Sequence, residues 1–529
     1  MHLVGSSCAD HHVPIQRHRG FDGLAVPTSV TDQRDIVLRG GRVIDPETGR
    51  DAICDVRISG RQIDEIGNGL APGAVDIDVT AHVVTAGFVD LHSHATEVAD
   101  LQLRALDGVT TALELEAGVT PVDAAYRRAA ADGRPVNYGF ATSWALARME
   151  VLGGISPDGR LSTFLANIAS PAWRGPASPA QLGALTSRLA ADLADGALGI
   201  GVLIGYAPGT DPAEYLRLAA LAADAGAPTF THTRDLAEFV PRTRIDGAEE
   251  IVRAAGETGA HMHYCHVNST SLRHVDRVHS LVSRARSAGS RVSTEAYPYG
   301  SGMTGIGAAF LAPERLPERG LVPSDLTYAP TCEQVTSAAR LRELRAADPG
   351  GLAIIRHLDE GVPADREVLL RALTYPDTIV ASDAMPVTWP GQPPEELSWP
   401  LPPGAITHPR TAGTFSRALR MLASDGTGPV GAGGPLGLTE TLRRCSLLPA
   451  QLMAEHVPAM RTKGRLQPGC DADIVVFDPA TVRDQATYVQ STRPSAGIRH
   501  VLVNGSFVVR DGAIVPGARP GEPIRARPR

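Results

Sequence analysis

Two histidines directly after an apolar segment are the residues of this chain best placed to do chemistry. The segment 86–91 reads Ala-Gly-Phe-Val-Asp-Leu and runs into His92-Ser93-His94. Residues two apart in a strand point to the same side, so both imidazoles would project together from a strand end. Two neutral imidazoles supply half of the ligands of a divalent transition-metal site. Because such a pair also occurs by chance in strands, the other half has to come from elsewhere in the chain.

Eight strand-like segments alternate with stretches of helical composition through the middle of the chain. We predict these strands at residues 85–91, 110–116, 136–143, 197–204, 227–232, 261–267, 292–298 and 378–383. Eight strand–helix units predict a (β/α)8 TIM-like barrel, with a doubly wound open sheet as the alternative. In a barrel, the functional side chains lie at the carboxyl ends of the strands.

Polar side chains stand at five of these predicted strand ends. Besides His92 and His94, they are Glu114 and Glu116 on the second strand, His232 on the fifth, His266 on the sixth and Asp383 on the eighth. Each histidine taken singly is better explained as a core residue, but a set that meets at one barrel mouth indicates a metal site. Imidazole and carboxylate ligands favour Zn²⁺, as one or two ions, or another divalent transition metal.

Asp383 is the expected catalytic residue. It follows the segment Thr-Ile-Val-Ala-Ser at 378–382, which is apolar until its end. A carboxylate there would accept the proton of a metal-activated water and deliver it to a leaving nitrogen. The alternative role for Asp383 is a helix N-cap.

Short β-like segments near both ends of the chain predict a smaller second domain. Asn504-Gly505, between two apolar segments, is typical of a two-residue hairpin. We expect both ends to pair into one small β-sandwich. The predicted units are a poorly ordered N-terminal arm (1–34), the first part of the sandwich (35–82) and the barrel (83–460). The second part of the sandwich (461–515) and a C-terminal tail (516–529) follow. The Gly- and Pro-rich segment 299–350 suits an active-site lid better than a packed layer.

Composition limits the class of protein. The chain has 529 residues, 43% hydrophobic and 20% charged, with a net charge of −8, so no basic surface suggests a nucleic acid partner. No apolar stretch is long enough for a membrane span, and the first 34 residues lack the apolar core of a signal peptide. Six scattered cysteines are typical of reduced thiols, which predicts a cytoplasmic location.

Several motifs together resemble the metal-dependent amidohydrolase superfamily, in its D-aminoacylase (N-acyl-D-amino-acid deacylase) branch. The matching residues are Gly40 to Pro46, His92 and His94, Gly108 to Thr111, His232 to Arg234, His266, Tyr297 to Tyr299, Ser382-Asp383, His408 to Arg410, Gly413 to Phe415 and the tail from Lys463 to Pro479. The resemblance implies that His92 and His94 bind one metal position, that His232 and His266 bind the other, and that Asp383 shuttles the proton. It also implies hydrolysis of a linear amide, most directly an N-acyl-D-amino acid.

One departure from the family concerns the metal bridge. Many members of the superfamily bridge two metals with a carbamylated lysine, but the only lysine here is Lys463, outside the predicted barrel. D-aminoacylases use a cysteine after the Gly-Val-Thr-Thr strand, and this chain has alanine at or beside that position. A glutamate of the second strand should therefore serve as ligand. We expect Glu116 rather than Glu114, and the alternative role is a salt bridge to an arginine.

A second departure concerns the substrate. Deacylases of this branch usually carry a lysine two residues after the sixth-strand histidine, where it meets the substrate carboxylate, and this chain has Asn268 instead. Asn268 donates hydrogen bonds but carries no charge, so Arg234 or Arg410 would have to replace the lost ionic contact. Together with Tyr297, these are the expected substrate-binding residues.

Two other functions stay open at this point. The same metal site would suit a cyclic amide or imide hydrolase or a deaminase. A catalytically silent scaffold is disfavoured, because such a protein has no reason to keep all the histidines and Asp383. The expected partner is a small-molecule amide, without nucleic acid or membrane, and homo-oligomer formation is left open.

Overall fold

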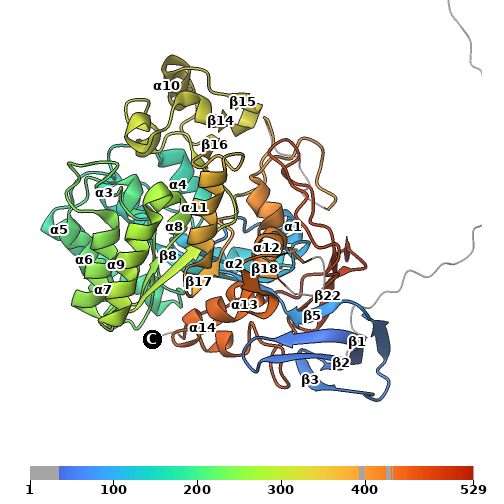
Figure 1. Ribbon diagram of the computed structural model, residues 1–529. Coiled ribbons are helices and arrows are strands. Elements are labelled where there is room, and N and C mark those ends of the chain that lie inside the picture. The colour runs from blue at the N-terminus through green and yellow to red at the C-terminus, as the bar shows by residue number, and fades with distance from the viewer. Residues whose placement is uncertain (1–34, 392–398, 425–429, 432, 528–529) are drawn as a thin grey trace, which may run out of the picture.

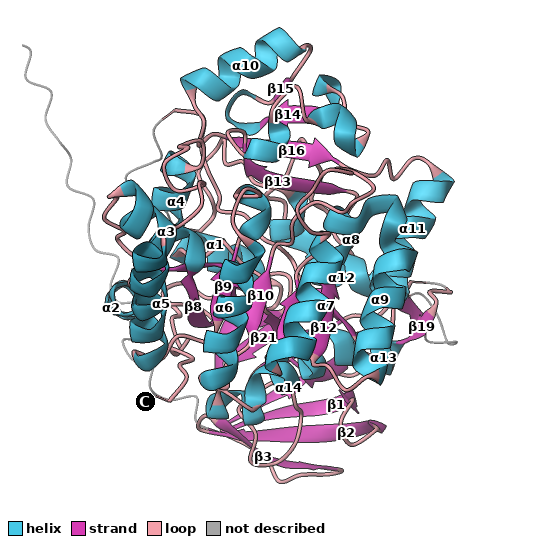
Figure 2. Cartoon of the chain, turned by 90° about the vertical axis from the view of Figure 1, so that its left-hand side faces the viewer, coloured by secondary structure: helices cyan, strands magenta, loops and turns pink. Residues whose placement is uncertain are grey.

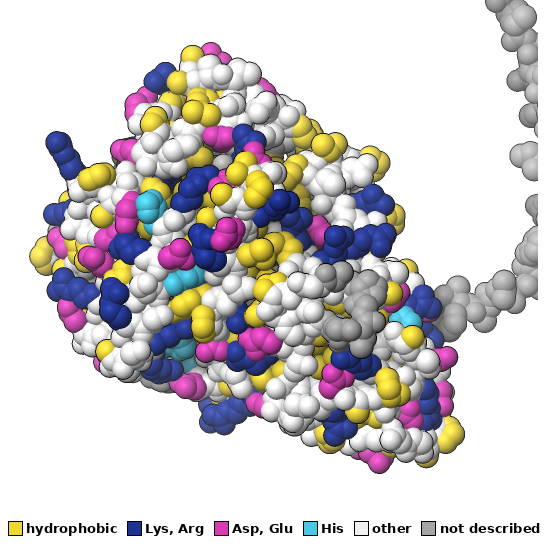
Figure 3. Space-filling model, viewed as in Figure 1, with side chains coloured by type: hydrophobic (Ala, Val, Ile, Leu, Met, Phe, Trp, Pro, Cys, Tyr) yellow, Lys and Arg dark blue, Asp and Glu magenta, His cyan; other side chains and the backbone are white. Residues whose placement is uncertain are grey.

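A computed structural model describes residues 35–391, 399–424, 430–431 and 433–527. The predicted N-terminal arm, residues 1–34, lies outside the described residues. Within the described part, no helix is long and apolar enough to cross a bilayer. On the face seen in Figure 3, acidic and basic side chains are interspersed rather than gathered in one patch.

Eight parallel strands form the core of the molecule in the order β6–β7–β8–β9–β10–β11–β12–β17. Their bounds are Phe88–Asp90, Val109–Val119, Asn137–Ser143, Ile200–Val202, Thr229–Thr231, Met262–Tyr264, Val292–Ala296 and Thr378–Val380. A parallel bridge between Ser93 and Ala384 joins the two edge strands just beyond their ends, so the sheet is nearly closed. The predicted barrel is confirmed: seven of the predicted strands contain one of these, and β7 extends beyond the predicted range 110–116 at both ends.

Helices follow most barrel strands and cover the outside of the sheet (Figure 1). They are α1 Val98–Ala105, α2 Val122–Asp132, α3 Trp144–Gly153, α4 Leu161–Asn167, α5 Pro179–Ala194, α6 Pro212–Asp224, α7 Gly247–Thr258, α8 Val267–Ser271, α9 Val275–Ser287, α11 Pro363–Thr374, α12 Pro409–Leu422, α13 Leu438–Leu442 and α14 Leu448–Ala454. Their starts are stabilised by ordinary caps: Asp246, for example, accepts from the backbone of Ala248 and Glu249 at the start of α7.

Both chain ends share one sheet below the barrel. Strands β1 Asp35–Asp45, β2 Arg50–Ser59, β3 Gln62–Gly67, β4 Val75–Asp78 and β5 Val83–Ala86 come from the N-terminal side, and β20 Ile474–Phe477, β21 Ile498–Val503, β22 Ser506–Arg510 and β23 Ala513–Ile514 from the C-terminal side. The halves join where β5 pairs with β20. Asn504 and Gly505 both have positive φ between β21 and β22, so the predicted hairpin and the β-domain shared by both ends are confirmed.

The only lysine fixes this domain to the barrel. Lys463 is buried, and its Nζ lies 2.8 Å from a carboxylate oxygen of both Asp471 and Asp473. Asp473 also accepts from Asn137 of β8 at 2.8 Å. Lys463 therefore has a structural role at the domain junction.

The segment predicted as a lid is a small packed sheet. Strands β13 Ser301–Gly305, β16 Leu352–Arg356, β14 Leu326–Tyr328 and β15 Glu333–Gln334 pair in that order, with helix α10 Ala338–Ala347 beside them. Figure 2 shows this insert on one end of the barrel, opposite the β-domain. The sequence suggested an irregular segment here because its strands are short and separated by Gly and Pro.

The C-terminal tail closes the other end of the barrel. The backbone of Ile524 bonds to Tyr138 of β8 at 2.7 Å and to the hydroxyl of Tyr126 at 2.6 Å. Ile524 and Ala526 belong to one buried apolar cluster with Leu198 and Phe230. Because this end is filled with apolar side chains, the polar site lies at the end that faces the insert.

Candidate metal centre and active-site cavity

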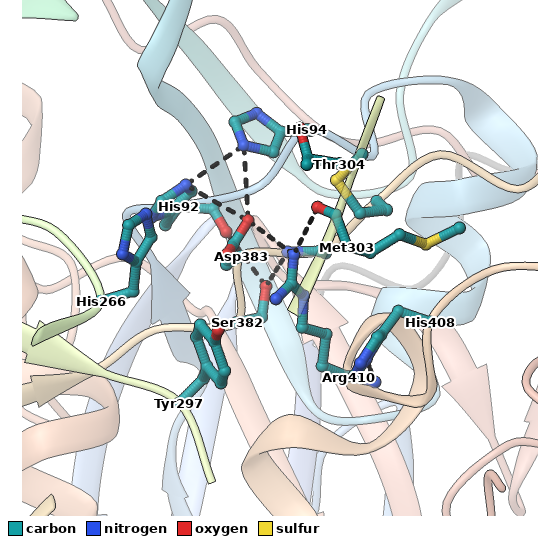
Figure 4. A network of polar contacts seen from close by, with 12 residues as sticks. His92, His94, His266, Tyr297, Met303, Thr304, Ser382, Asp383, His408 and Arg410 are labelled. Carbon is teal, nitrogen blue, oxygen red and sulfur yellow. Dashed lines mark hydrogen bonds and ion pairs between the residues drawn. The ribbon is translucent and has the colours of Figure 1, made fainter. Parts of the chain in front are cut away.

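His92 and His94 leave the end of β6 side by side, as their spacing predicted. Their Nε2 atoms are 3.2 Å apart, and both lie 3.5 Å from Oδ1 of Asp383 (Figure 4). The backbone of His94 is tied to the eighth strand, because its N–H donates to the carbonyl of Ala384 at 2.8 Å. The first and last strands thus hold the pair and Asp383 together.

Strand β7 carries the two glutamates, and the structure separates them. Oε1 of Glu116 lies 2.6 Å from Nε2 of His266 and 3.2 Å from Nδ1 of His232, and Oε2 lies 3.2 Å from Nε2 of His92. Glu116 therefore sits at the centre of the histidines.

Glu114 lies behind them instead. Its Oε2 is 2.7 Å from Nδ1 of His94, and its Oε1 accepts from the backbone of Gly118. A register irregularity between Glu114 and Val119 bends the strand at this point. Glu114 orients His94, whereas Glu116 faces the position that a metal would take.

Asp383 lies three residues after the end of β17 and has a left-handed backbone, φ +50°. The next described helix, α12, begins at Pro409 and is capped by His408, so Asp383 does not cap a helix. Its Oδ1 forms an ion pair with Nη2 of Arg410, at 2.9 Å. A strained conformation that aims a carboxylate into a cavity is typical of a functional residue.

The buried charges of this cluster favour a cation. Burial acts to lower the pKa of His92, yet the carboxylates of Glu116, Glu295 and Asp383 raise it well above its usual value. Burial likewise opposes ionisation of Glu116, but His92 and His266 hold its pKa well below its usual range. The cluster therefore stabilises positive charge among carboxylates, which is what a divalent ion would supply.

The donor set fits a transition metal. Ligand atoms of His92, Glu116 and His266 lie within 4.8 Å of one another, and so do those of His92, His94 and Asp383. The two groups share His92 and consist of imidazole nitrogens and carboxylate oxygens. Such a set suits zinc and similar first-row ions.

Two buried residues near His92 escaped the sequence analysis. Glu295 of β12 lies with Oε1 2.5 Å from Nδ1 of His92. Cys265, after β11, has its Sγ within 4.8 Å of the same histidine and Glu295. Burial raises the pKa of the Cys265 thiol well above its usual value, so it stays protonated. For Glu295 the available signal was a glutamate inside a predicted barrel strand, as for Glu114 and Glu116.

A cavity of about 650 Å³, which includes solvent at its mouth, opens above the cluster. Its wall carries His94, Glu116, His232, His266, Tyr297 and Asp383 together with apolar side chains. The insert contributes Met303, Thr304, Phe310 and Ile355. The insert thus shapes the space in which a substrate would lie.

The predicted substrate residues divide into two groups. Tyr297 lines the cavity, and the guanidinium of Arg410 stacks 4.8 Å above its ring. Nε and Nη1 of Arg410 are buried without a hydrogen-bond acceptor among the described residues. Arg410 therefore has donors to spare beside the cavity.

Arg234 and Asn268 do not line the cavity. Nε of Arg234 donates to Glu250 at 2.7 Å, which neutralises its charge behind strand β10. The side chain of Asn268 bonds to the backbone of Tyr297 and Tyr299 at 3.3 and 3.4 Å. The expectation that they contact substrate is corrected, because each is committed to a structural partner.

Replacing each strand-β7 glutamate by glutamine tests this assignment. We expect Glu116→Gln to lose bound metal after dialysis, because an amide oxygen is a weaker ligand than a carboxylate. Glu114→Gln should keep most of it, since its amide oxygen still accepts from His94. The metal content of both variants, measured by mass spectrometry, shows which glutamate is the ligand. Loss confined to the Glu114 variant would reverse the assignment.

Comparisons with known proteins agree with this geometry. An Amidohydrolase family model matches residues 398–509. N-acyl-D-glutamate deacylase of Alcaligenes xylosoxydans xylosoxydans is 28% identical over 524 residues, covering 93% of this chain and 97% of that protein. D-aminoacylase of the same organism is 25% identical, and the match covers 90% of this chain and 95% of that protein.

Solved structures give the same result. N-acyl-D-glutamate deacylase from Bordetella bronchiseptica, complexed with zinc and a phosphonate inhibitor, matches with a TM-score of 0.71 at 25% identity, over 93% of this chain and 99% of that one. A D-hydantoinase shares the fold, with a TM-score of 0.58 at 16% identity over 93% and 99% of the chains. These comparisons confirm the resemblance to the metal-dependent amidohydrolase superfamily, in its D-aminoacylase branch.

Proposed function

We propose that this protein hydrolyses the linear amide C–N bond of a small molecule, most directly an N-acyl-D-amino acid or a close analogue. The observation that carries the proposal is the meeting of four histidines, Glu116 and Asp383 in one cluster, of which all but the buried His92 line one cavity. The relatives named as deacylases of N-acyl-D-amino acids support this substrate class. The scattered cysteines support our proposal of a cytoplasmic location.

The proposed metal ligands are His92, His94, Glu116, His232 and His266, for one or two ions of zinc or another divalent transition metal. The Bordetella relative, which is described with zinc, supports this cofactor. A bound cation would polarise the amide carbonyl and lower the pKa of the attacking water. No carbamylated lysine is involved, because Lys463 is ion-paired at the domain junction.

Asp383 is the proposed proton shuttle. Burial opposes its ionisation, but Arg410 and His92 lower the pKa of Asp383 below its usual value, so it is a carboxylate at neutral pH and can act as a base. It would accept the proton of the attacking water and then donate it to the amide nitrogen. That second transfer is needed because an unprotonated amide nitrogen is a poor leaving group.

A polar recess beside Gly302 is the proposed site for the substrate carboxylate. A Cβ placed on Gly302 would lie 3.1 Å from Nε2 of His357, 3.2 Å from Oη of Tyr297 and 3.5 Å from Nη1 of Arg410. Burial and the neighbouring Arg319 and Arg410 lower the pKa of His357 to about 3, so its imidazole is neutral. The spare donors of Arg410 would pair with a carboxylate there. Arg410 takes the role expected of the family's lysine.

The remaining wall suits an apolar acyl group. Leu161, Phe164, Leu203, Phe310 and Met385 line it. Burial of apolar surface stabilises binding by about 25 cal/mol per Å². An acyl chain of several carbons would therefore bind more tightly than formyl or acetyl.

A substrate screen with and without metal tests the function. We expect zinc-loaded protein to hydrolyse N-acyl-D-amino acids faster than N-acyl-L-amino acids and cyclic imides. Dialysis against a chelator should abolish turnover, and zinc, manganese or cobalt should restore it. Preferential turnover of cyclic imides would favour the cyclic amidase alternative, and full activity in metal-free protein would exclude the proposed mechanism.

The variant Asp383→Asn tests the shuttle. An amide keeps the shape of the site but cannot carry the proton, and general acid–base catalysis contributes roughly 10²–10⁴-fold. We expect kcat to fall by that factor while the zinc content, measured in parallel, stays at the wild-type value. A variant within tenfold of wild type would move the role to another residue.

The variant Gly302→Ala tests the carboxylate recess. Its methyl group would occupy the space between His357, Tyr297 and Arg410. Hydrogen bonds to a charged group contribute about 1.5–3 kcal/mol, so we expect kcat/KM for an N-acyl-D-amino acid to fall about 10–100-fold. An analogue lacking the carboxylate is the control and should change far less. Equal losses for both substrates would contradict the recess.

A further inference from the structure

A row of polar side chains crosses the barrel interior beneath the proposed metal ligands. His263 of β11 and Glu295 of β12 are 0% and 1% exposed. Ser293 of β12 is the direct register neighbour of His263, and His261 precedes β11 by one residue. Barrel interiors are usually filled by branched apolar residues, so this polar row needs an explanation.

The row is one continuous chain of hydrogen bonds that starts at His92. Glu295 accepts from Nδ1 of His92 through Oε1, at 2.5 Å, and Oε2 lies 3.0 Å from Nε2 of His263. Nδ1 of His263 is 2.7 Å from Oγ of Ser293, and that oxygen is 3.0 Å from Nε2 of His261. His261 lies in the wall of a second cavity of about 320 Å³ beside Arg291 and His456.

When His263 carries a single proton, these contacts are consistent in one direction. A carboxylate accepts but does not donate, so Nδ1 of His92 and Nε2 of His263 must both donate to Glu295. Nδ1 of His263 then accepts the hydroxyl proton of Ser293. The same oxygen accepts from Nε2 of His261. With one proton on each of His263 and His261, every polar side-chain atom from Glu295 to His261 has a hydrogen-bond partner, because Nδ1 of His261 accepts from Arg291 at 3.4 Å.

We propose that Glu295 and His263 are positioning residues for His92. They fix its Nδ1 as a donor, which leaves the lone pair of Nε2 facing Glu116 and Asp383, where the metal is proposed to bind. The inference rests on the proposed function in taking His92 as a ligand. Histidine ligands commonly donate their other N–H to a carboxylate, and loss of such a partner weakens metal binding by 10–100-fold.

The geometry gives His263 a role that core packing alone does not require. Oε1 of Glu295 also accepts from the backbone N–H of His266 at 3.2 Å, so one oxygen contacts two proposed ligand residues. The other oxygen is held by His263. Glu114, which orients His94, is held instead by the backbone of Gly118. Without His263, Glu295 would lose the contact that sets the angle of its carboxylate.

Zinc affinity, measured by competition with a chromophoric chelator, tests the proposal independently of activity. His263→Leu removes the donor at similar volume and should weaken zinc binding about 10–100-fold. His263→Gln should recover most of the affinity, because its amide N–H can still donate to Glu295. Ser293→Ala, at a less buried position, should act in the same direction by a smaller factor and serves if the leucine variant does not fold.

Two controls make the outcome decisive. His279→Leu replaces a buried histidine that stacks on Tyr375 at 4.0 Å on helix α9, outside the chain described above. It should lower the melting temperature of the metal-free protein without changing zinc affinity. Unchanged affinity in His263→Leu and Ser293→Ala, or an equal loss in His279→Leu, would overturn the positioning role.

The variant His92→Asn separates this proposal from the proposed metal site. We expect it to lose zinc binding. If His92→Asn loses zinc binding and the His263 and Ser293 variants keep the wild-type affinity, only the positioning role fails. If His92→Asn binds zinc like wild type, the proposed ligand set fails and the positioning role fails with it.

Discussion

The burial of Glu116 among His92, His232 and His266 is the constraint on which the rest of this structure depends. A carboxylate removed from water is costly unless opposite charge and hydrogen bonds surround it. Glu114, Glu295 and Asp383 are buried close by, while Arg410 is paired to only one of the four. The site therefore holds more negative than fixed positive charge, and either protonated imidazoles or a divalent cation must balance it. The raised pKa of His92 has the same cause, because the surrounding carboxylates favour a positive charge at this position.

The barrel brings these charged side chains together because its parallel strands end at one place. The first, second, fifth, sixth and eighth strands each place one or two polar side chains at the same mouth. Close backbone packing brings them within reach: a Cβ on Gly201 of β9 would lie 2.4 Å from the carbonyl oxygen of Glu116, so only glycine permits this approach. Apolar residues of the tail and of α14 form a cluster at the opposite end, so the proposed metal ligands meet at the end that faces the insert.

Arg410 connects the metal side of the cavity with the substrate side. Its Nη2 pairs with Asp383 and favours the ionised form of that carboxylate, and its Nη1, which has no hydrogen-bond acceptor among the described residues, lies beside the recess at Gly302. Its own position is fixed by helix α12 and by the stacking of its guanidinium on Tyr297. A substrate that fills the recess would therefore act on the same guanidinium that sets the protonation of Asp383. In the proposed function, substrate binding and proton transfer would therefore be coupled through a single side chain.

The sequence by itself determined the (β/α)8 barrel, the β-domain shared by both ends and the set of polar residues at the strand ends. Local pattern suffices for these, because hydrophobic periodicity fixes each strand and parallel strands bring their ends together. Only the tertiary structure decided that Glu116 lies among His92, His232 and His266 while the carboxylate of Glu114 contacts His94, since a local irregularity in β7 separates two residues that an ideal strand would place on one face. Tertiary contacts also committed Arg234 to Glu250 and Asn268 to backbone groups, and joined His92 to Glu295, 203 residues away in sequence. The partner of a charged or polar side chain depends on which segments the fold brings together, and no local spacing encodes that choice.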